Sequence, residues 1–172
     1  MKYSPCFIAL VFCFVWNAPL SAQTLDSAKA DTVPKARENW YWAHLELGPG
    51  FGFNQNGFNV TLLQAGLGGS VAFSHHLITL EGNIVLTGLV NGFLWAGGMY
   101  GYIARNDWTF SSVSAGLAWV GNGRDAGVGL LLEGQIAAKV PVLGVGLKLL
   151  ANINAIYPYG ALSVIVPLGW MP

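Results

Sequence analysis

The residues closest to a catalytic set lie in one short segment, Ser74-His75-His76, which is followed by Glu81. A serine, a histidine and a carboxylate could together form a hydrolase site in which the histidine activates the serine. Adjacent histidines in a tight turn, however, point apart, and nothing in the sequence supplies an oxyanion hole. The same residues lack a convincing third metal ligand. We therefore expect a solvated turn here, with no catalytic residue, metal or cofactor.

The glycine-rich segments and the cysteines offer no chemistry either. Gly48–Gly50, Gly66–Gly69 and Gly144–Gly146 are not phosphate-binding loops, because none opens a helix with Lys-Ser/Thr behind it. Cys6 and Cys13 both lie in a segment that we expect to be removed. The exported chain would then have no thiol, which excludes disulfides, cysteine metal sites and cysteine nucleophiles.

Polar residues recur at a period of two in Gly127–Asn154, where Glu133 and Lys148 each stand in an alternating run. Successive side chains of a strand point to opposite faces, so the alternation predicts two strands. If a two-residue turn at Val140-Pro141 joins them, Glu133 lies opposite Lys148. The other side of the two runs is aliphatic and consists of Val128, Leu130, Leu132, Ile136, Leu143, Val145, Leu147, Leu149 and Ile153.

The same pattern repeats from Asn39 onward, with polar and glycine-rich turns between the runs. We expect about eight strands: the two in 127–154, and others near 40–48, 60–73, 77–86, 93–104, 108–121 and 159–170. A turn at His75-His76 would place Glu81 opposite Ser70. In the fourth strand we expect Trp95, Met99 and Ile103 to face outward.

These strands predict an all-β fold, a closed antiparallel eight-stranded transmembrane β-barrel. Only 9% of the residues are charged and 53% are hydrophobic, with a mean hydropathy of +0.50, whereas an average soluble domain has about 25% charged residues. An aliphatic outer face and a sparse polar inner face are typical of a barrel in lipid, where closure leaves no unpaired edge. A soluble lipocalin-like binder would need the reverse arrangement. The zero net charge also argues against nucleic-acid binding.

Helices are the alternative for the uncharged stretches 82–104 and 149–172, which are long enough to cross a membrane. The period-two recurrence of polar residues favours strands.

Polar residues on the predicted inner face are the first set of candidate site residues. Side chains fill the interior of so narrow a barrel, so we expect no continuous channel. We interpret the set as a lumen polar network of Glu46, Glu81, Glu133, Lys148, Gln64, Gln135, Asn83 and Asn152. In the alternative, a small ligand or a narrow pore uses the space beside inward glycines, namely Gly66, Gly68, Gly129, Gly144 and Gly146.

Aromatic residues near the strand ends are the second set. Girdles of tryptophan and tyrosine are expected at the depth of the membrane interfaces. One rim would carry Trp40, Trp42, Trp108 and Trp170, and the other Trp95, Trp119, Tyr157 and Tyr159.

The chain divides into three parts. Residues 1–22 have the positive start, the apolar run and the small final residue, Ala22, of a secretory signal peptide. Residues 23–39 mix charges without apolar periodicity, which predicts a flexible periplasmic linker. Residues 40–172 form the predicted barrel.

The final strand has an uninterrupted apolar side that consists of Leu162, Val164, Val166, Leu168 and Trp170. With the signal peptide and the aromatic rims, this makes residues 40–172 resemble the small eight-stranded outer-membrane β-barrels of Gram-negative bacteria, such as outer-membrane protein X, the membrane domain of outer-membrane protein A and the outer-membrane protein W group. Such chains usually end on the aromatic residue, and Met171-Pro172 departs from that pattern.

The resemblance implies a location in the outer membrane, contact with outer-membrane lipid and insertion by the barrel-insertion machinery. It further implies a monomeric, non-enzymatic protein with a structural or surface-interaction role. Some outer-membrane barrels remodel lipid A, so a lipid-modifying enzyme is an alternative.

Overall fold

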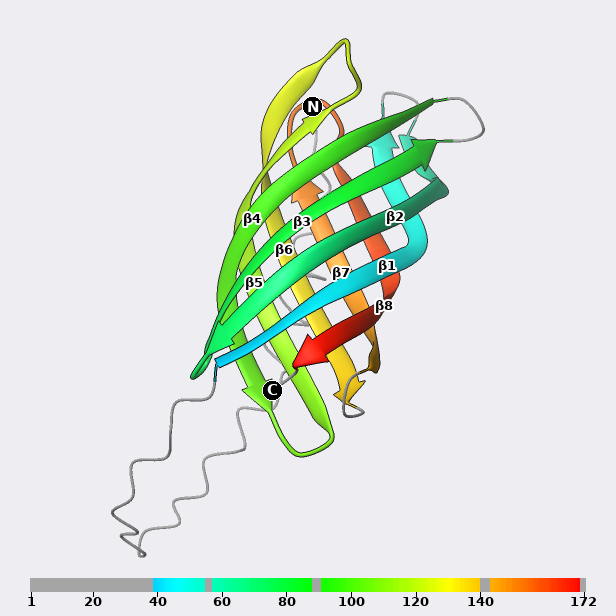
Figure 1. The fold of residues 1–172 in the computed structure, drawn as a ribbon. Helices are drawn as coiled ribbons and strands as arrows, with labels where there is room; N and C mark the ends of the chain where they lie inside the picture. Colours follow the sequence, from blue (N-terminus) through cyan, green and yellow to red (C-terminus); the bar gives the residue numbers. More distant parts are fainter. Residues whose placement is uncertain (1–38, 55–56, 88–90, 140–142, 171–172) are drawn as a thin grey trace, which may run out of the picture. The chain divides into compact units, whose positions relative to one another are not determined.

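The computed structural model describes residues 39–54, 57–87, 91–139 and 143–170. The predicted signal peptide, all but the last residue of the predicted linker, the turn at Val140-Pro141 and the terminal Met171-Pro172 lie outside these residues. The described residues form eight strands (Figure 1): β1 (Asn39–Asn54), β2 (Gly57–Phe73), β3 (His76–Thr87), β4 (Asn91–Arg105), β5 (Thr109–Gly121), β6 (Ala126–Lys139), β7 (Gly144–Ile153) and β8 (Tyr159–Trp170).

Each strand pairs antiparallel with the next, and β1 also pairs antiparallel with β8, which closes the barrel. The closing ladder runs from Tyr41 opposite Trp170 to Gly52 opposite Tyr159. The predicted fold class, an all-β barrel of eight antiparallel strands, is therefore confirmed. Among the described residues no helix could cross a membrane, and the described parts of 82–104 and 149–172 belong mainly to strands.

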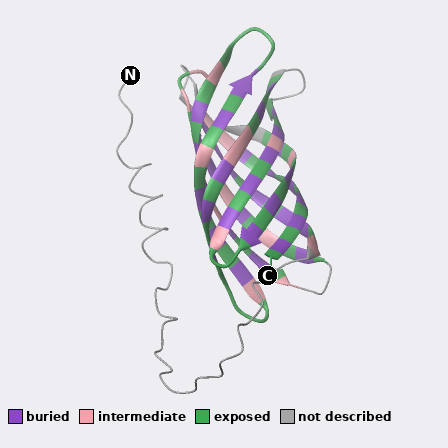
Figure 2. Ribbon diagram, turned by 60° about the vertical axis from the view of Figure 1, so that its left-hand side comes forward, coloured by how far each residue is buried: buried purple, intermediate pink, exposed green. Residues whose placement is uncertain are grey.

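Buried and exposed residues alternate along the strands, as Figure 2 shows by its purple and green bands. On the outer face, Leu67 and Leu80 are each 66% exposed. On the inner face, His44 and Lys148 are each 1% exposed. The aliphatic rows therefore face outward and the polar rows inward, as the period of two predicts.

Two apolar clusters occupy the two ends of the barrel interior. The lower cluster, at the end where β1 begins in Figure 1, contains Trp40, Trp42, Ala72, Leu77, Ile103, Phe110, Ala137 and Ile165. The upper cluster contains Val85, Phe93, Trp95, Met99, Ala118, Val120, Leu131, Leu150, Tyr159 and Ala161. Most of the buried polar side chains come from strand positions between these clusters. The interior is thus layered, whereas the sequence predicts a lumen that is polar throughout.

The predicted register is wrong by two residues in two strand pairs, β2–β3 and β6–β7. The β2–β3 turn is Ser74-His75, with Phe73 opposite His76, so Thr79 rather than Glu81 lies opposite Ser70. Between β6 and β7, Gln135 rather than Glu133 is the direct partner of Lys148. In both cases the partner changes by two residues, which keeps every side chain on its predicted face.

The predicted facing of β4 is also wrong. Trp95, Met99 and Ile103 are buried inside, while Tyr100 and Tyr102 face outward. Both sides of β4 carry apolar and aromatic residues, so its own alternation does not distinguish the faces. The pairing with β3 does, because Trp95 lies opposite the inward-facing Asn83.

Candidate functional site

Five ionisable side chains meet inside the barrel between the two apolar clusters. His44 and Glu46 come from β1, Glu81 from β3, Glu133 from β6 and Lys148 from β7. All five are buried. We call them the charge cluster. The inward alternation of four strands is what brings these residues together from distant parts of the sequence.

Lys148 is the centre of the charge cluster. Its ammonium nitrogen lies 3.0 and 2.9 Å from the two carboxylate oxygens of Glu81 and 3.6 Å from Glu133 Oε2. It also forms an ion pair with Glu46 Oε2. One cation is therefore shared by three carboxylates.

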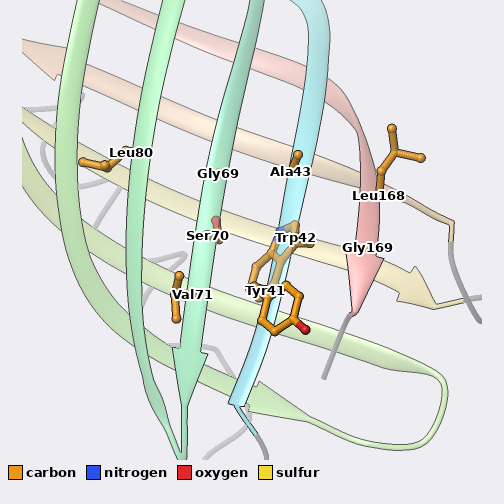
Figure 3. A pocket seen from close by; sticks show the side chains of 9 residues that line it. All are labelled: Tyr41, Trp42, Ala43, Gly69, Ser70, Val71, Leu80, Leu168 and Gly169. Atoms are coloured by element: carbon orange, nitrogen blue, oxygen red, sulfur yellow. The ribbon is translucent and has the colours of Figure 1, made fainter.

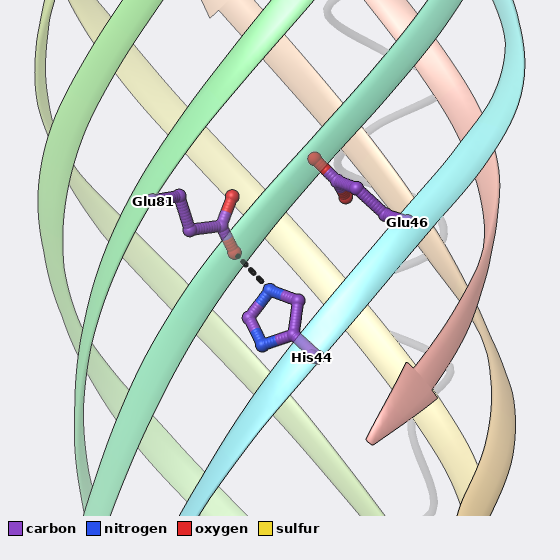
Figure 4. Close-up of side chains that lie close together, drawn as sticks. All are labelled: His44, Glu46 and Glu81. Carbon is purple, nitrogen blue, oxygen red and sulfur yellow. Dashed lines mark hydrogen bonds and ion pairs between the residues drawn. The ribbon is translucent and has the colours of Figure 1, made fainter. Parts of the chain in front are cut away.

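His44 joins the cluster through Glu81. Its Nε2 lies 3.0 Å from Glu81 Oε1, and Figure 4 shows the imidazole and the carboxylate pointing toward each other, with Glu46 close by. The polar network that the sequence predicts does not include His44. The signal that could have found it was its position two residues before Glu46 on the same face.

Neutral polar side chains support the carboxylates. The Gln64 amide donates to Glu46 Oε1 at 3.1 Å, and the Ser114 hydroxyl donates to Glu133 Oε1 at 3.3 Å. Hydrogen bonds to ionised groups are stronger than those between neutral groups. These contacts hold the carboxylates in place around the lysine.

Three further members of the predicted network are buried and have neighbours outside the charge cluster. Gln135 donates to the Ser112 hydroxyl at 2.8 Å, and Asn152 accepts from the Asn154 amide at 2.9 Å. Asn83 lies beside Gly66 of the neighbouring strand.

Carboxyl groups outnumber basic groups in the charge cluster. Three carboxylates face one lysine, and His44 adds a positive charge only when it is protonated. Ligand atoms of His44, Glu46 and Glu81 lie within 4.8 Å of one another, which is close enough to share a metal ion. The Lys148 ammonium already contacts both of these carboxylates. The geometry therefore fits an ion-paired core better than a metal site.

Side chains fill the space beside the inward glycines. A Cβ added to Gly66 would lie 1.9 Å from Asn83 Oδ1, and one added to Gly68 would lie 2.6 Å from two atoms of His44. A Cβ on Gly129 would lie 2.3 Å from Asn152 Oδ1. These glycines make room for neighbouring polar side chains, which leaves no space at these three positions for the small ligand considered from the sequence.

The Ser74, His75, His76 and Glu81 set does not assemble. Ser74 and His75 are exposed at the β2–β3 turn, whereas Glu81 is buried in the charge cluster. His76 hydrogen-bonds the Tyr100 hydroxyl through Nδ1 at 2.5 Å and stacks on Phe73. The geometry of a serine hydrolase is absent from this set.

The structure divides the predicted aromatic girdle between inside and outside. Trp40, Trp42, Trp95 and Tyr159 are buried in the apolar clusters, so these four residues do not belong to a lipid-facing girdle. Trp108 and Trp119 are exposed, at 77% and 48%, and Tyr157 is partly buried against Phe93. Trp170 ends β8, and its side chain lies outside the described part of the chain.

Besides Trp108, four of the described aromatic residues face outward at the lower rim. Tyr41, Phe73, Tyr100 and Tyr102 are exposed there, and His76 packs between the rings of the last three. Trp40 and Trp42 share the inner side with His44 and Glu46, which places Tyr41 between them on the outer side. An aromatic residue near a strand end therefore belongs to the girdle only if its side chain also faces outward.

Comparisons with known proteins relate this architecture to solved barrels. No protein-family model and no curated protein sequence matches the chain. Neisserial surface protein A matches with a TM-score of 0.58 at 11% identity, over 76% of this chain and 97% of that one. Ail, the attachment invasion locus protein of Yersinia pestis, matches with a TM-score of 0.55 at 9% identity, over 77% and 99%.

The N-terminal β-barrel domain of Pseudomonas aeruginosa OprF gives a TM-score of 0.56 at 11% identity, over 77% of this chain and 100% of that domain. Identities this low relate the proteins by fold. The chain thus has the closed eight-stranded fold of the small outer-membrane β-barrels, as its sequence pattern predicts.

Proposed function

We propose that this protein is an integral outer-membrane barrel without enzymatic activity, whose outer face contacts lipid. The observation that carries the proposal is the inverted distribution of residues on the wall. Large apolar side chains such as Leu45, Leu67 and Val128 are more than half exposed, while Glu46, Glu81 and Lys148 are buried. Exposed apolar surface of this extent is unfavourable in water and favourable in hydrocarbon.

The lumen does not conduct ions. A permeating ion would have to pass both apolar clusters and the ion pairs of Lys148 between them. At the lower end, the Arg105 guanidinium lies 3.3 Å from the centre of the Trp40 ring and adds a cation–π contact to this closure. A closed interior supports a structural or surface-interaction role rather than transport.

Such a role would rest on the barrel's short loops. The β5–β6 turn is exposed and carries Arg124 and Asp125, held by hydrogen bonds from their amides to Asn122 Oδ1. Ail, which has the same fold, is described as an attachment invasion locus protein. Loop-mediated contact with another surface is the role that this parallel supports.

During biogenesis, the barrel-insertion machinery would recognise β8. Its outward residues Leu162, Val164 and Leu168 form an exposed apolar row toward the end of the chain. The closed ladder leaves no free sheet edge among the described strands, which favours a monomer in the membrane.

Membrane fractionation combined with planar-bilayer recording tests the proposal. We expect the protein in the outer-membrane fraction, a faster migration on detergent gels before boiling than after, and no ohmic conductance in a bilayer. Recovery as a detergent-free soluble protein would contradict the membrane location. A stable open channel would contradict the closed lumen.

A further inference from the structure

A groove of about 450 Å³ runs across the outer wall near the lower rim (Figure 3). It crosses β8, β1, β2 and β3, and its lining includes Tyr41, Ala43, Gly69, Val71, Leu80 and Leu168. None of the residues that line it is charged.

The strand register explains the groove. Ala43 pairs with both Leu168 and Gly69, and Gly69 pairs with Leu80. Two small residues therefore lie side by side on the outer face, with a leucine at each end. Side chains on one face of a sheet lie beside their cross-strand partners. The small side chain of Ala43 and the absent side chain of Gly69 therefore leave one joint depression across β1 and β2.

Leu80 leans away from the groove toward the next strand. A Cβ added to Gly98, its partner on β4, would lie 3.2 Å from Leu80 Cδ2. A Cβ added to Gly69 would meet no atom within 4 Å. The Leu80 side chain thus fills the space beside one glycine and leaves the other open.

The depth of the groove indicates its occupant. The outward aromatic row of Phe73, His76 and Tyr102 marks the lower rim, and Gly69 precedes Phe73 on β2 by four residues. At about 3.3 Å per residue, this places Gly69 roughly 13 Å along the strand from the aromatic row. Aromatic rows mark the membrane interface, so the groove belongs to the hydrocarbon region.

A second copy of the chain fits this site less well than a lipid. A stable protein interface buries about 800 Å² on each partner, which is far more than a groove two small residues wide can provide. The groove is continuous with the apolar wall formed by Val71, Leu80 and Leu168. We propose that it binds one acyl chain of a membrane phospholipid. This inference rests on the membrane location proposed above.

Native mass spectrometry of the full chain, released from nanodiscs of phosphatidylethanolamine and phosphatidylglycerol, tests the site. Gly69→Leu fills the groove, and the backbone accepts a side chain here because a Cβ at this position meets no atom within 4 Å. Ala65→Leu is the matched control, since Ala65 is exposed on the same face of β2 and does not line the groove. Ala43→Leu is a second filling variant.

We expect the wild type and Ala65→Leu to retain one phospholipid. Retention by Gly69→Leu and Ala43→Leu should fall several-fold, because the filled groove no longer offers the acyl chain its van der Waals contacts. A photoactivatable acyl chain should label Val71 or Leu168 in the wild type, and this labelling should weaken in the filled variants.

Equal retention by all variants, or no retained lipid on an inserted wild type, would overturn the acyl-chain site and leave the membrane location intact. Loss of a dimer in the filled variants, without loss of lipid, would assign the groove to a second copy. A wild type that does not enter the bilayer would contradict the membrane location as well.

Discussion

Lys148 is the residue on which the barrel interior depends most. It is the lysine that contacts Glu46, Glu81 and Glu133, and its side chain is almost fully buried. A buried charge pair adds little net stability compared with apolar residues, but removing one partner leaves the other charges without compensation. Removing the lysine therefore lowers the stability of the barrel by much more than its ion pairs add to it.

We predict that Lys148→Met destabilises the barrel by about 3–5 kcal/mol. The measurement is the unfolding transition in detergent, followed by gel mobility after heating. Lys139→Met, at the partly exposed end of β6, is the control and should change the transition little. An unchanged transition in Lys148→Met would contradict the assignment of this lysine as the shared counterion.

The three carboxylates should respond unequally to neutralisation. Glu81 holds Lys148 with both oxygens and also contacts His44, whereas Glu133 is 3.6 Å from the ammonium. Glu81→Gln removes the ion pair that uses both carboxylate oxygens, while Glu133→Gln mainly relieves repulsion between carboxylates. We expect Glu81→Gln to cost at least about 1 kcal/mol more than Glu133→Gln, from the strength of charged hydrogen bonds. Equal costs in the same unfolding assay would contradict this division of roles.

At the scale of the strand, glycine and asparagine act as a pair. Gly66 on β2 has no side chain, and Asn83 on β3 occupies the space that a Cβ would need. A side chain added to a filled interior forces its neighbours off their preferred positions. The inward glycines are therefore part of the packing of the lumen.

Gly66→Ala should destabilise the barrel by about 1–3 kcal/mol because it overpacks the interior against Asn83. The double variant Gly66→Ala with Asn83→Ala should recover part of that loss, because removal of the Asn83 amide frees the space that the new Cβ at position 66 needs. A double-variant cycle on unfolding midpoints measures this coupling. Strictly additive effects would show that the two residues do not compete for the same space.

The strands that sequence predicts best are those with one aliphatic side and one polar side. β3, β6 and β7 are of this kind, and their facing is as predicted. In β4, apolar residues stand on both sides, so the facing depends on pairing with β3, which a single strand does not encode. The two register errors have a local cause, because a turn assigned from residue types alone sets the whole ladder, and an assignment that is off by one position changes every partner by two residues.

For the candidate site, the sequence predicts which residues face inward but not which of them meet. The charge cluster joins Glu81 and Lys148, which are 67 positions apart. Which inward residues share one level of the barrel depends on the stagger of every intervening strand. Trp40 and Trp42 are buried because they alternate with the outward Tyr41 and so share the inner side with His44, a position that residue type alone does not indicate.

At the scale of the whole molecule, apolar residues have two separate tasks. On the outside they form the exposed wall, and inside they form the clusters above and below the charge cluster. A soluble barrel needs only the inner set, because its outer wall meets water. The high hydrophobic content, 53% of residues, reflects both demands.

Site-directed spin labelling along β3 in lipid vesicles tests the facing of the wall most directly. Cysteines would be introduced one at a time at Ile78, Thr79, Leu80, Asn83 and Ile84, with the two native cysteines replaced. We predict high oxygen accessibility at Ile78, Leu80 and Ile84, which are exposed on the wall, and low accessibility at Thr79 and Asn83, which are buried. A profile without a period of two, or one with its maxima at Thr79 and Asn83, would contradict the account.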